Sequence, residues 1–592
     1  MDRTSRTFGT SRTSRISRTS RVSRISGISR ISRISGISGI SGVSEISGIY
    51  RISWIAALLA AALGIVLTLD PRLYINGDNV DYMFMARAIR AGDLWPSERF
   101  PPLFPMLLAP VQAVFGMALQ PQKILVLLLG LGSVVLLGRV VARRVAGCRG
   151  AWIFLAAALS IPFVEYSHYV MSEVPFFFFA LGAIDLCDRV LRRPPENGAP
   201  SLSQFLRRDA LRGQPALWGL AAWIAAAFYT RSAGVTLLAA VPLSLLLSGR
   251  RRPAAAVALR AAVLALPWLI HSLLDRGGGA YFTQLLQVNP YYPEFGFLTP
   301  ERLFNRVREN ALYYFIQQVP VTVMPAAYRS TYSEFDAARY FYPWWMSAVL
   351  LLPLAAGLWS AVRKGDAGGL YVTATLVLCC LWPLIWAGSR FLVPVAPLLV
   401  LYWFLGVTGA SQTVGAPAPP SAGARAPGPG KSRGHSLARA TQWAVLVVLA
   451  FLAVRNLVFY KQETAAYPPE WRKYFQVLEW IGANTPPEAV VVDRKPGFVE
   501  FVAGRRAVSF PREKDPDRML DSFRRHGATH VVLSSLPYDD IGRYLDPAIE
   551  QRLAYFTPLF ALKDPTTYVL AFHPQPLRPE PPRPPAPSSP GP

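Results

Sequence analysis

Long apolar stretches recur along this chain and rule out most folds for it. Several run for about 18 to 20 residues, the length of helix that crosses the ~30 Å hydrocarbon core of a bilayer, as at 52–69, 124–141, 344–362 and 443–459. Hydrophobic residues make up 52% of the 592 residues. A water-soluble protein does not distribute apolar residues in this way, so the sequence predicts an α-helical, polytopic integral membrane protein.

Basic residues predict the topology, because short cytoplasmic loops are enriched in Lys and Arg. If the segment 101–118, which carries four prolines, crossed the membrane fully, the arginines at 143–149 would fall outside. We therefore expect 101–118 to form a helix that lies in the outer interface or re-enters it. The remaining apolar segments predict about eleven transmembrane helices, at 52–69, 123–142, 150–163, 173–190, 215–229, 233–248, 254–274, 343–362, 369–387, 390–408 and 441–459.

The net charge of +25 has two interpretations, nucleic-acid binding or cytoplasmic loops that contact anionic lipid. In a membrane protein the second is favoured, and we expect no nucleic-acid partner. The four cysteines show no spacing typical of a disulfide framework or a metal site. The first apolar stretch is too long for a cleavable signal peptide, so we expect none.

Composition changes divide the chain into six parts. Residues 1–51 hold a Ser/Arg repeat with a period of three and are expected to be a disordered basic tail. The other parts are a transmembrane module (52–408) with outer loops at 70–122 and 275–342, a disordered cytoplasmic linker (409–440), a last transmembrane helix (441–460), a small soluble α/β domain outside the membrane (461–573) and a Pro-rich tail (574–592).

The α/β domain is predicted from its local patterns. "WRKYFQVLEWIGANTP" and "DPDRMLDSFRRHG" have the spacing of helices, and "AVVVD" and "THVVLSS" the composition of strands. No catalytic motif is present in this domain, so we expect it to dock the acceptor. In the second outer loop, "ERLFNRVRENALYYFIQQV" predicts an amphipathic helix.

Polar residues gather at the predicted outer ends of different transmembrane helices. Each has an ordinary explanation: Asp78 would cap the helix that starts near Val80, and Asp81 would favour the helix dipole in its first turn. Their shared side of the membrane nevertheless favours a common cavity, because ionisable groups at membrane depth are costly. The residues are Asp78, Asp81, Glu165, His168, Glu173, Arg231, His271 and Arg390.

These residue types suit glycosyl transfer from a lipid-linked sugar. A polyprenyl-phosphate donor keeps its tail in the bilayer and its phosphate at the interface, where an arginine fork can hold it. Phosphate is a good leaving group, so one carboxylate suffices as the base that deprotonates an incoming hydroxyl or amine. The sequence has no Walker A, HExxH, GxSxG or GxGxxG motif, so nucleotide and zinc chemistry lack support.

The sequence resembles the GT-C superfamily of membrane glycosyltransferases, which includes protein O-mannosyltransferases and the lipid A aminoarabinose transferase. "GDNVDYMFMARAI" is similar to the first-loop pattern of that superfamily, and "RFPPLFPMLLAP" to its proline-rich juxtamembrane helix. "MSEVPFFFF", "TRSAGVTLL" and "RFLVPVAPLLVL" follow in the same order, so the resemblance covers about residues 52–408.

The resemblance implies roles for individual residues. Asp78 falls on the catalytic aspartate, Glu173 where relatives carry a second acid, and Asp81 is a further catalytic candidate. Candidates for substrate binding are Arg231 and Arg390, which fall at donor-phosphate positions, together with His168 and Tyr82. Asn79 replaces the usual Glu of an Asp-Glu pair, so we favour a metal-independent reaction without a cofactor, although a divalent metal stays open.

The sequence therefore predicts a glycosyltransferase of the bacterial inner membrane with its active site facing the periplasm. It would move a hexose or pentose from a polyprenyl-phosphate donor to a lipid, an envelope glycan or a protein. The alternative is a flippase or transporter of lipid-linked sugars. Transporters commonly show internal repeats and charges at mid-membrane, whereas the charges here lie at outer helix ends. The sugar and the acceptor stay open.

Overall fold

The computed structural model describes residues 48–577, except 76, 98, 193–214, 275–279, 291, 293–294, 328–341, 410–431 and 464–465. Most of the predicted basic tail (1–51), of the linker (409–440) and of the Pro-rich tail (574–592) lies outside the described residues. Residues Tyr50–Pro592 cluster as one unit, which contains both the helical module and the C-terminal domain.

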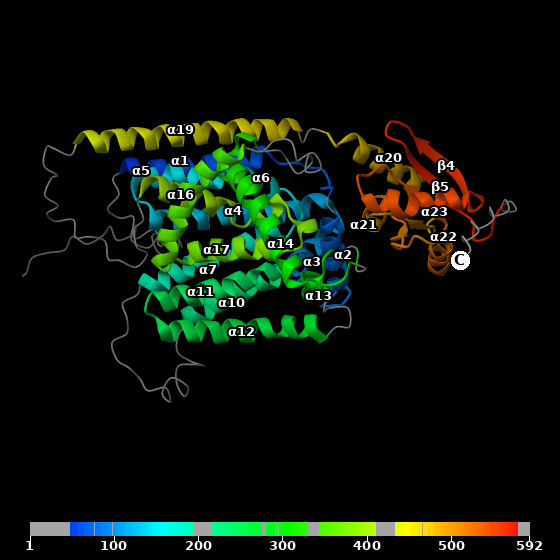
Figure 1. The fold of residues 1–592 in the computed structure, drawn as a ribbon, viewed down its shortest axis with the longest axis horizontal. Coiled ribbons are helices and arrows are strands. Elements are labelled where there is room, and N and C mark those ends of the chain that lie inside the picture. Colours follow the sequence, from blue (N-terminus) through cyan, green and yellow to red (C-terminus); the bar gives the residue numbers. More distant parts are fainter. Residues whose placement is uncertain are drawn as a thin grey trace, which may run out of the picture. The chain divides into compact units, whose positions relative to one another are not determined.

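A helix occurs at each of the eleven positions predicted to span the membrane, and these helices run side by side in the module (Figure 1). Within the described residues, four of them (α1, α4, α12, α16) have the length and hydropathy to cross a bilayer, and shorter apolar helices accompany them. The protein is therefore an integral membrane protein, and the count of eleven crossings stays a prediction. The helices are α1 (Gly48–Leu67), α4 (Leu119–Arg144), α5 (Gly147–Ala158), α7 (Glu173–Arg192), α10 (Pro215–Thr230), α11 (Val235–Leu247), α12 (Arg251–Leu274), α16 (Trp344–Arg363), α17 (Ala367–Leu381), α18 (Ala396–Thr408) and α19 (Ser432–Glu463).

Prolines make three of these helices shorter than predicted. The segment predicted as one helix at 150–163 breaks after α5, and α6 (Ile161–Tyr166) starts with Pro162 in its first turn. α17 ends at Leu381, two residues before Pro383, and the chain continues in the short 3₁₀ turns η9 (Leu384–Trp386) and η10 (Ser389–Leu392) before α18. Because proline lacks an N–H and restricts the residue before it, the helix stops earlier than hydropathy alone suggests.

The first outer loop folds into two helices that pack against each other, α2 (Asp78–Arg90) and α3 (Leu103–Phe115). α3 covers the proline-rich segment that we predicted as an interfacial or re-entrant helix. Its 13 residues reach about 20 Å, less than the ~30 Å of the hydrocarbon core. This length is consistent with a helix that does not cross the membrane.

The second outer loop contains the predicted amphipathic helix, and two polar residues of that helix are buried. Arg306 and Asn310 of α14 are buried and donate hydrogen bonds to backbone carbonyls, while Phe304 is 67% exposed. The charged residues Arg302, Arg308 and Glu309 of the same helix are also exposed. The other elements of this loop are α13 (Ala280–Leu286), α14 (Pro300–Leu312), η6 (Tyr313–Gln318), α15 (Val319–Val323) and η7 (Pro325–Ala327), and η4 (Ser232–Gly234) precedes α11 in the module.

The C-terminal domain is a mixed five-stranded sheet with helices, as the sequence predicts in outline. The strand order is β2-β1-β3-β5-β4, in which β2, β1 and β3 are parallel, and β5 is antiparallel to β3 and β4. Both predicted helices and both predicted strands are confirmed as α20, α22, β1 and β3. The elements are α20 (Pro469–Asn484), β1 (Val490–Val492), α21 (Pro496–Phe498), η12 (Val499–Ala503), β2 (Arg506–Val508), α22 (Pro516–His526), β3 (His530–Leu533), η13 (Ile541–Leu545), α23 (Asp546–Gln551), η14 (Leu553–Tyr555), β4 (Phe556–Leu562) and β5 (Thr567–Phe572).

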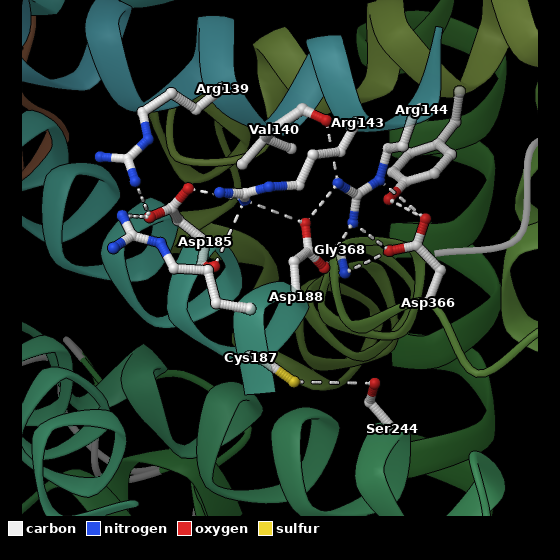
Figure 2. Close-up of polar contacts among 12 residues, drawn as sticks. Arg139, Val140, Arg143, Arg144, Asp185, Cys187, Asp188, Ser244, Asp366 and Gly368 are labelled. Carbon is white, nitrogen blue, oxygen red and sulfur yellow. Dashed lines mark hydrogen bonds and ion pairs between the residues drawn. The ribbon is translucent and has the colours of Figure 1, made fainter. Parts of the chain in front are cut away.

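A buried ion network joins the C-terminal parts of α4 and α7 to the start of α17 (Figure 2). Arg144 of α4 is 1% exposed and contacts Asp188 of α7 at 2.8 Å and Asp366, before α17, at 2.9 Å. Arg143 contacts Asp185 at 2.6 Å. The arginines at 143–144 therefore contribute to the packing of the module, and the carboxylates around them largely neutralise their charge. The topology prediction treated these arginines only as charges of a cytoplasmic loop.

The topology prediction is tested by reporter fusions after Gly409 and after Pro574. Only α19 lies between these points in the predicted topology, so the two reporters should lie on opposite sides of the membrane, inside at Gly409 and outside at Pro574. Alkaline phosphatase and green fluorescent protein, which are active on opposite sides, give the measurement. The same sidedness at both points would refute the eleven-helix topology.

Candidate active site

The loop before α2 is fixed by an internal ion pair and by contacts with two other parts of the chain. Asp70 pairs with Arg72 at 3.0 Å, and the Lys123 ammonium of α4 donates to the Asp70 carbonyl at 2.5 Å. The Tyr467 hydroxyl donates to the Leu73 carbonyl at 2.7 Å. Because these bonds hold the backbone, the first residue of α2 has a defined position. That residue is Asp78.

The Asp78 carboxylate points to Arg390, and does not cap its own helix. Gly77 occupies the N-cap position, and no side chain caps α2. Asp78 Oδ2 lies 2.7 Å from Arg390 Nη2, and both side chains are about one-fifth exposed, at 20% and 19%. Burial opposes ionisation of Asp78, but Arg390, with help from Arg99 and Lys495, lowers the pKa of this carboxyl below its ordinary value. Asp78 is therefore held as a carboxylate.

Glu173 connects Arg390 to the second predicted arginine. Its carboxylate, which is 0% exposed, lies 2.5 Å from Arg231 Nη1 and 3.2 Å from Arg390 Nε. The two guanidinium groups also lie over the Phe391 ring. One buried acid thus fixes both arginines, which come from the turn before η4 and from η10.

Tyr82 joins this group through Ser172. The Tyr82 and Ser172 hydroxyls share a hydrogen bond of 2.8 Å, and Arg231 Nη1 donates to the same Ser172 oxygen at 3.0 Å. The structure therefore brings together Asp78, Tyr82, Glu173, Arg231 and Arg390, although they are up to 312 positions apart in sequence.

These residues border a cavity of about 600 Å³. Its lining includes the charged residues Asp78, Arg231 and Arg390, and aromatic and aliphatic residues of α12, α17 and η9, such as Trp268, Leu378 and Trp386. Glu173 lies behind the arginines and does not line the cavity. A chamber with one carboxylate, several cations and apolar lining residues fits an amphiphilic anion.

Besides Glu173, four residues predicted to share the cavity do not line it: Asp81, Glu165, His168 and His271. His168 is buried, its Nε2 bonds to the Ile65 carbonyl at 2.8 Å, and it does not line the cavity. Asp81 also does not line the cavity, and its side chain is exposed. Desolvation by the surrounding protein and the like charge of Asp78 raise the pKa of Asp81 to about 6. Neither position supports a direct role in the cavity.

Asn79, which the family resemblance aligns with the Glu of an Asp-Glu pair, makes its hydrogen bonds to the backbone around the start of α2. Its amide donates to the Tyr74 carbonyl at 2.9 Å and its oxygen accepts from the Val80 N–H at 2.7 Å. Among the described residues there is no cluster of three or more His, Cys, Asp or Glu side chains arranged to hold a metal ion.

Several residues that line the cavity were not predicted from the sequence, including one residue of the first outer loop and three of the C-terminal domain. Arg99 precedes the proline-rich helix, where a basic residue in "SERFPP" is a weak signal. The other three, Trp471, Lys495 and Tyr538, belong to the C-terminal domain. No pattern in a soluble α/β domain indicates that one of its turns lies against a distant membrane cavity.

No protein-family model and no curated protein sequence matches this chain. Solved structures do match it. The archaeal oligosaccharyltransferase AglB from Archaeoglobus fulgidus, in complex with an inhibitory peptide and a dolichol-phosphate, is 14% identical, with a TM-score of 0.50 over 88% of this chain and 74% of that one. ArnT from Cupriavidus metallidurans, bound to undecaprenyl phosphate, is 16% identical, with a TM-score of 0.49 over 88% and 98% of the two chains.

The likeness to AglB defines the class of fold: this chain has the fold of the GT-C glycosyltransferases. The prediction of a GT-C fold from the sequence motifs is thereby confirmed. At 14% identity the likeness concerns the fold, and the activity is argued from the site.

Proposed function

We propose that this protein is an integral-membrane glycosyltransferase that moves a sugar from a polyprenyl-phosphate donor to an acceptor outside the cytoplasm. The observation that carries the proposal is the ionised Asp78, paired with Arg390 at 2.7 Å in the lining of a cavity that aromatic and aliphatic residues also line. AglB, which shares the fold, has been solved with a dolichol-phosphate, a ligand of the same chemical class as the donor proposed here.

In the proposed reaction, Asp78 is the general base. A hydroxyl or amine of the acceptor attacks the anomeric carbon of the sugar, and its proton passes to the Asp78 carboxylate. The bond between that carbon and the phosphate oxygen breaks, and its electron pair stays on the phosphate. Arg390 and Arg231 stabilise the charge that develops there.

Arg390 links donor binding to the strength of the base. In the structure its guanidinium is shared between Asp78 and Glu173. A phosphate bound to Arg390 would compete with Asp78 for the same N–H groups, which weakens the ion pair. Because that pair is one reason for the lowered pKa of Asp78, phosphate binding would make Asp78 a stronger proton acceptor. Glu173 is then a positioning residue that keeps both arginines at the cavity.

Transfer of radiolabelled sugar from polyprenyl-phosphate donors, catalysed by the purified protein in detergent, tests the proposal. Since the acceptor is unknown, a membrane extract of the source cells supplies it. A flippase would move the labelled lipid across proteoliposomes without breaking the sugar–phosphate bond, and that result would replace the proposal. The sugar and the acceptor are identified from the labelled product.

Arg390→Lys should weaken binding of undecaprenyl phosphate about tenfold. Lysine keeps the charge but loses the planar fork that bonds to two oxygens at once, and a charge-assisted hydrogen bond is worth about 1.5–3 kcal/mol. Binding is measured on the purified protein, with Arg363→Lys, an exposed position at the end of α16, as control. Unchanged affinity in Arg390→Lys would remove Arg390 from the donor site.

A further inference from the structure

The C-terminal domain supplies part of the wall of the cavity. Trp471 comes from α20, Lys495 from the turn between β1 and α21, and Tyr538 from the segment after β3. A cation from a soluble domain therefore lies at the cavity that the membrane helices form.

The turn that carries Lys495 is held from inside its own domain. The buried Asp493 accepts hydrogen bonds from the Lys495 backbone N–H and from the Tyr474 hydroxyl, each at 2.6 Å. Next to it, Arg494 pairs with Asp540 at 2.7 Å. These contacts give the turn one conformation, so the position of Lys495 is set before a substrate binds.

The same turn packs closely on the helix that carries Asp78. A Cβ atom on Gly497 would come within 2.9 Å of Val80 Cγ2, so only glycine permits this approach. A Cβ atom on Gly77, the residue before Asp78, would lie 3.5 Å from Lys495 Nζ. The ammonium group is therefore next to the first turn of α2.

The Lys495 ammonium is a half-buried charge without an ion-pair partner among the described residues. Its Nζ lies over the Tyr538 ring, 4.7 Å from the ring centroid. By contrast, Arg231 and Arg390 share their charge with Glu173 and Asp78. The charge of Lys495 acts on Asp78 and Asp81, but no carboxylate of the described residues pairs with the ammonium directly, so an anion bound in the cavity would give it a direct partner.

We propose that Lys495 binds the phosphate of the lipid donor, together with Arg390, so that the C-terminal domain is part of the donor site. The proposal rests on the function proposed above. Arg390 pairs with Asp78, Lys495 lies next to the residue before Asp78, and all three line the same cavity, where a phosphate can accept hydrogen bonds from more than one cation. The sequence led us to expect that this domain docks the acceptor, and the inference revises that expectation.

Lys495→Gln in the full-length protein tests the inference, with undecaprenyl phosphate as the probe. Loss of one charge-assisted hydrogen bond should weaken its binding about tenfold to a hundredfold, and Lys495→Arg should restore most of it. Lys514→Gln, at an exposed position of the same domain, is the matched control and should bind as the wild type does. Undecaprenol, which lacks the phosphate, should bind equally to wild type and Lys495→Gln.

The outcomes separate this inference from the proposed function. If Lys495→Gln binds undecaprenyl phosphate as tightly as wild type does, Lys495 does not hold the phosphate. The same conclusion follows if the substitution weakens the binding of undecaprenol as much as it weakens the binding of undecaprenyl phosphate. If wild type binds the lipid phosphate and Arg390→Lys weakens it while Lys495→Gln does not, only the inference is refuted. Failure of the wild-type protein to bind the lipid phosphate would count against the proposed function itself.

Discussion

Asp78→Asn is expected to reduce sugar transfer by about 10²-fold or more while the protein still folds and inserts. Asparagine has nearly the same shape and keeps an oxygen that can accept a hydrogen bond from Arg390, but it cannot take a proton from the acceptor at neutral pH. Arg390 also keeps its contact with Glu173 at 3.2 Å, so the variant leaves no unpaired guanidinium. The measurements are the transfer rate and the melting temperature in detergent.

Asp81→Asn is the matched control for this substitution. Asp81 belongs to the same first turn of α2, but it is exposed and does not line the cavity. Its loss removes a helix-dipole interaction worth a few tenths to about 1 kcal/mol, so activity should stay close to that of wild type. An Asp78→Asn protein that retains most of its activity, or an inactive Asp81→Asn protein, would show that Asp78 is not the base.

The sequence predicts the positions of the helices well because hydropathy and helix length act locally. The segment 344–362, for example, becomes α16 (Trp344–Arg363) almost unchanged. Prediction fails where a local break competes with hydropathy. Pro162 and Pro383 end or restart helices inside segments that remain apolar throughout. The mean hydropathy of a segment does not reveal such a break, so a prediction from hydropathy extends the helix beyond its observed end.

In the C-terminal domain, the strands that were missed depend on pairing that is distant in sequence. β2 (Arg506–Val508) has only three residues, and it forms because it pairs with the buried β1. β4 (Phe556–Leu562) is an edge strand that contains Pro558, with a register shift between Pro558 and Phe560. A proline within a run argues against a strand unless the run lies at an edge. That position is known only from the sheet order.

The candidate site, too, was only partly predictable from the sequence. Asp78, Arg231 and Arg390 could be singled out because each is a charge at the end of an apolar helix. The ion pairs that define their roles required the structure, since Glu173 meets Arg390 only when α7 and η10 come together. His168 has the same sequence context but lies against the Ile65 carbonyl. Sequence gives the side of the membrane for such a residue, and it does not give the direction of the side chain.

The largest expected effect on stability comes from Arg144, far from the proposed site (Figure 2). This side chain is 1% exposed and holds three helices together: α4, which carries it, α7 through Asp188, and α17 through Asp366 at its N-cap. Arg144 also donates to the Val140 carbonyl at 3.0 Å, and Asp366 accepts from the Tyr402 hydroxyl of α18 at 3.2 Å.

Arg144→Met should therefore destabilise the protein strongly. Methionine fills much of the same volume, but it leaves Asp366 buried without its cation and Asp188 with only the longer contact to Arg143, at 3.6 Å. Removal of one partner from a buried ion pair costs about 3–5 kcal/mol, because the remaining charge is uncompensated. The melting temperature in detergent gives the measurement. Arg149→Met, in the same predicted inner loop and half-buried, should change it little.

A triple variant separates charge compensation from packing. If the cost of Arg144→Met lies in the charge that Asp188 and Asp366 lose as a partner, then Arg144→Met combined with Asp188→Asn and Asp366→Asn should recover much of the lost stability, since neutral groups are far cheaper to bury than charges. Asp366→Asn also keeps an oxygen that can accept the Gly368 N–H bond, now 2.9 Å long, at the start of α17. A triple variant as unstable as Arg144→Met would place the cost in lost packing and hydrogen bonds. Arg144→Met with the stability of wild type would mean that the network contributes nothing measurable to holding these helices together.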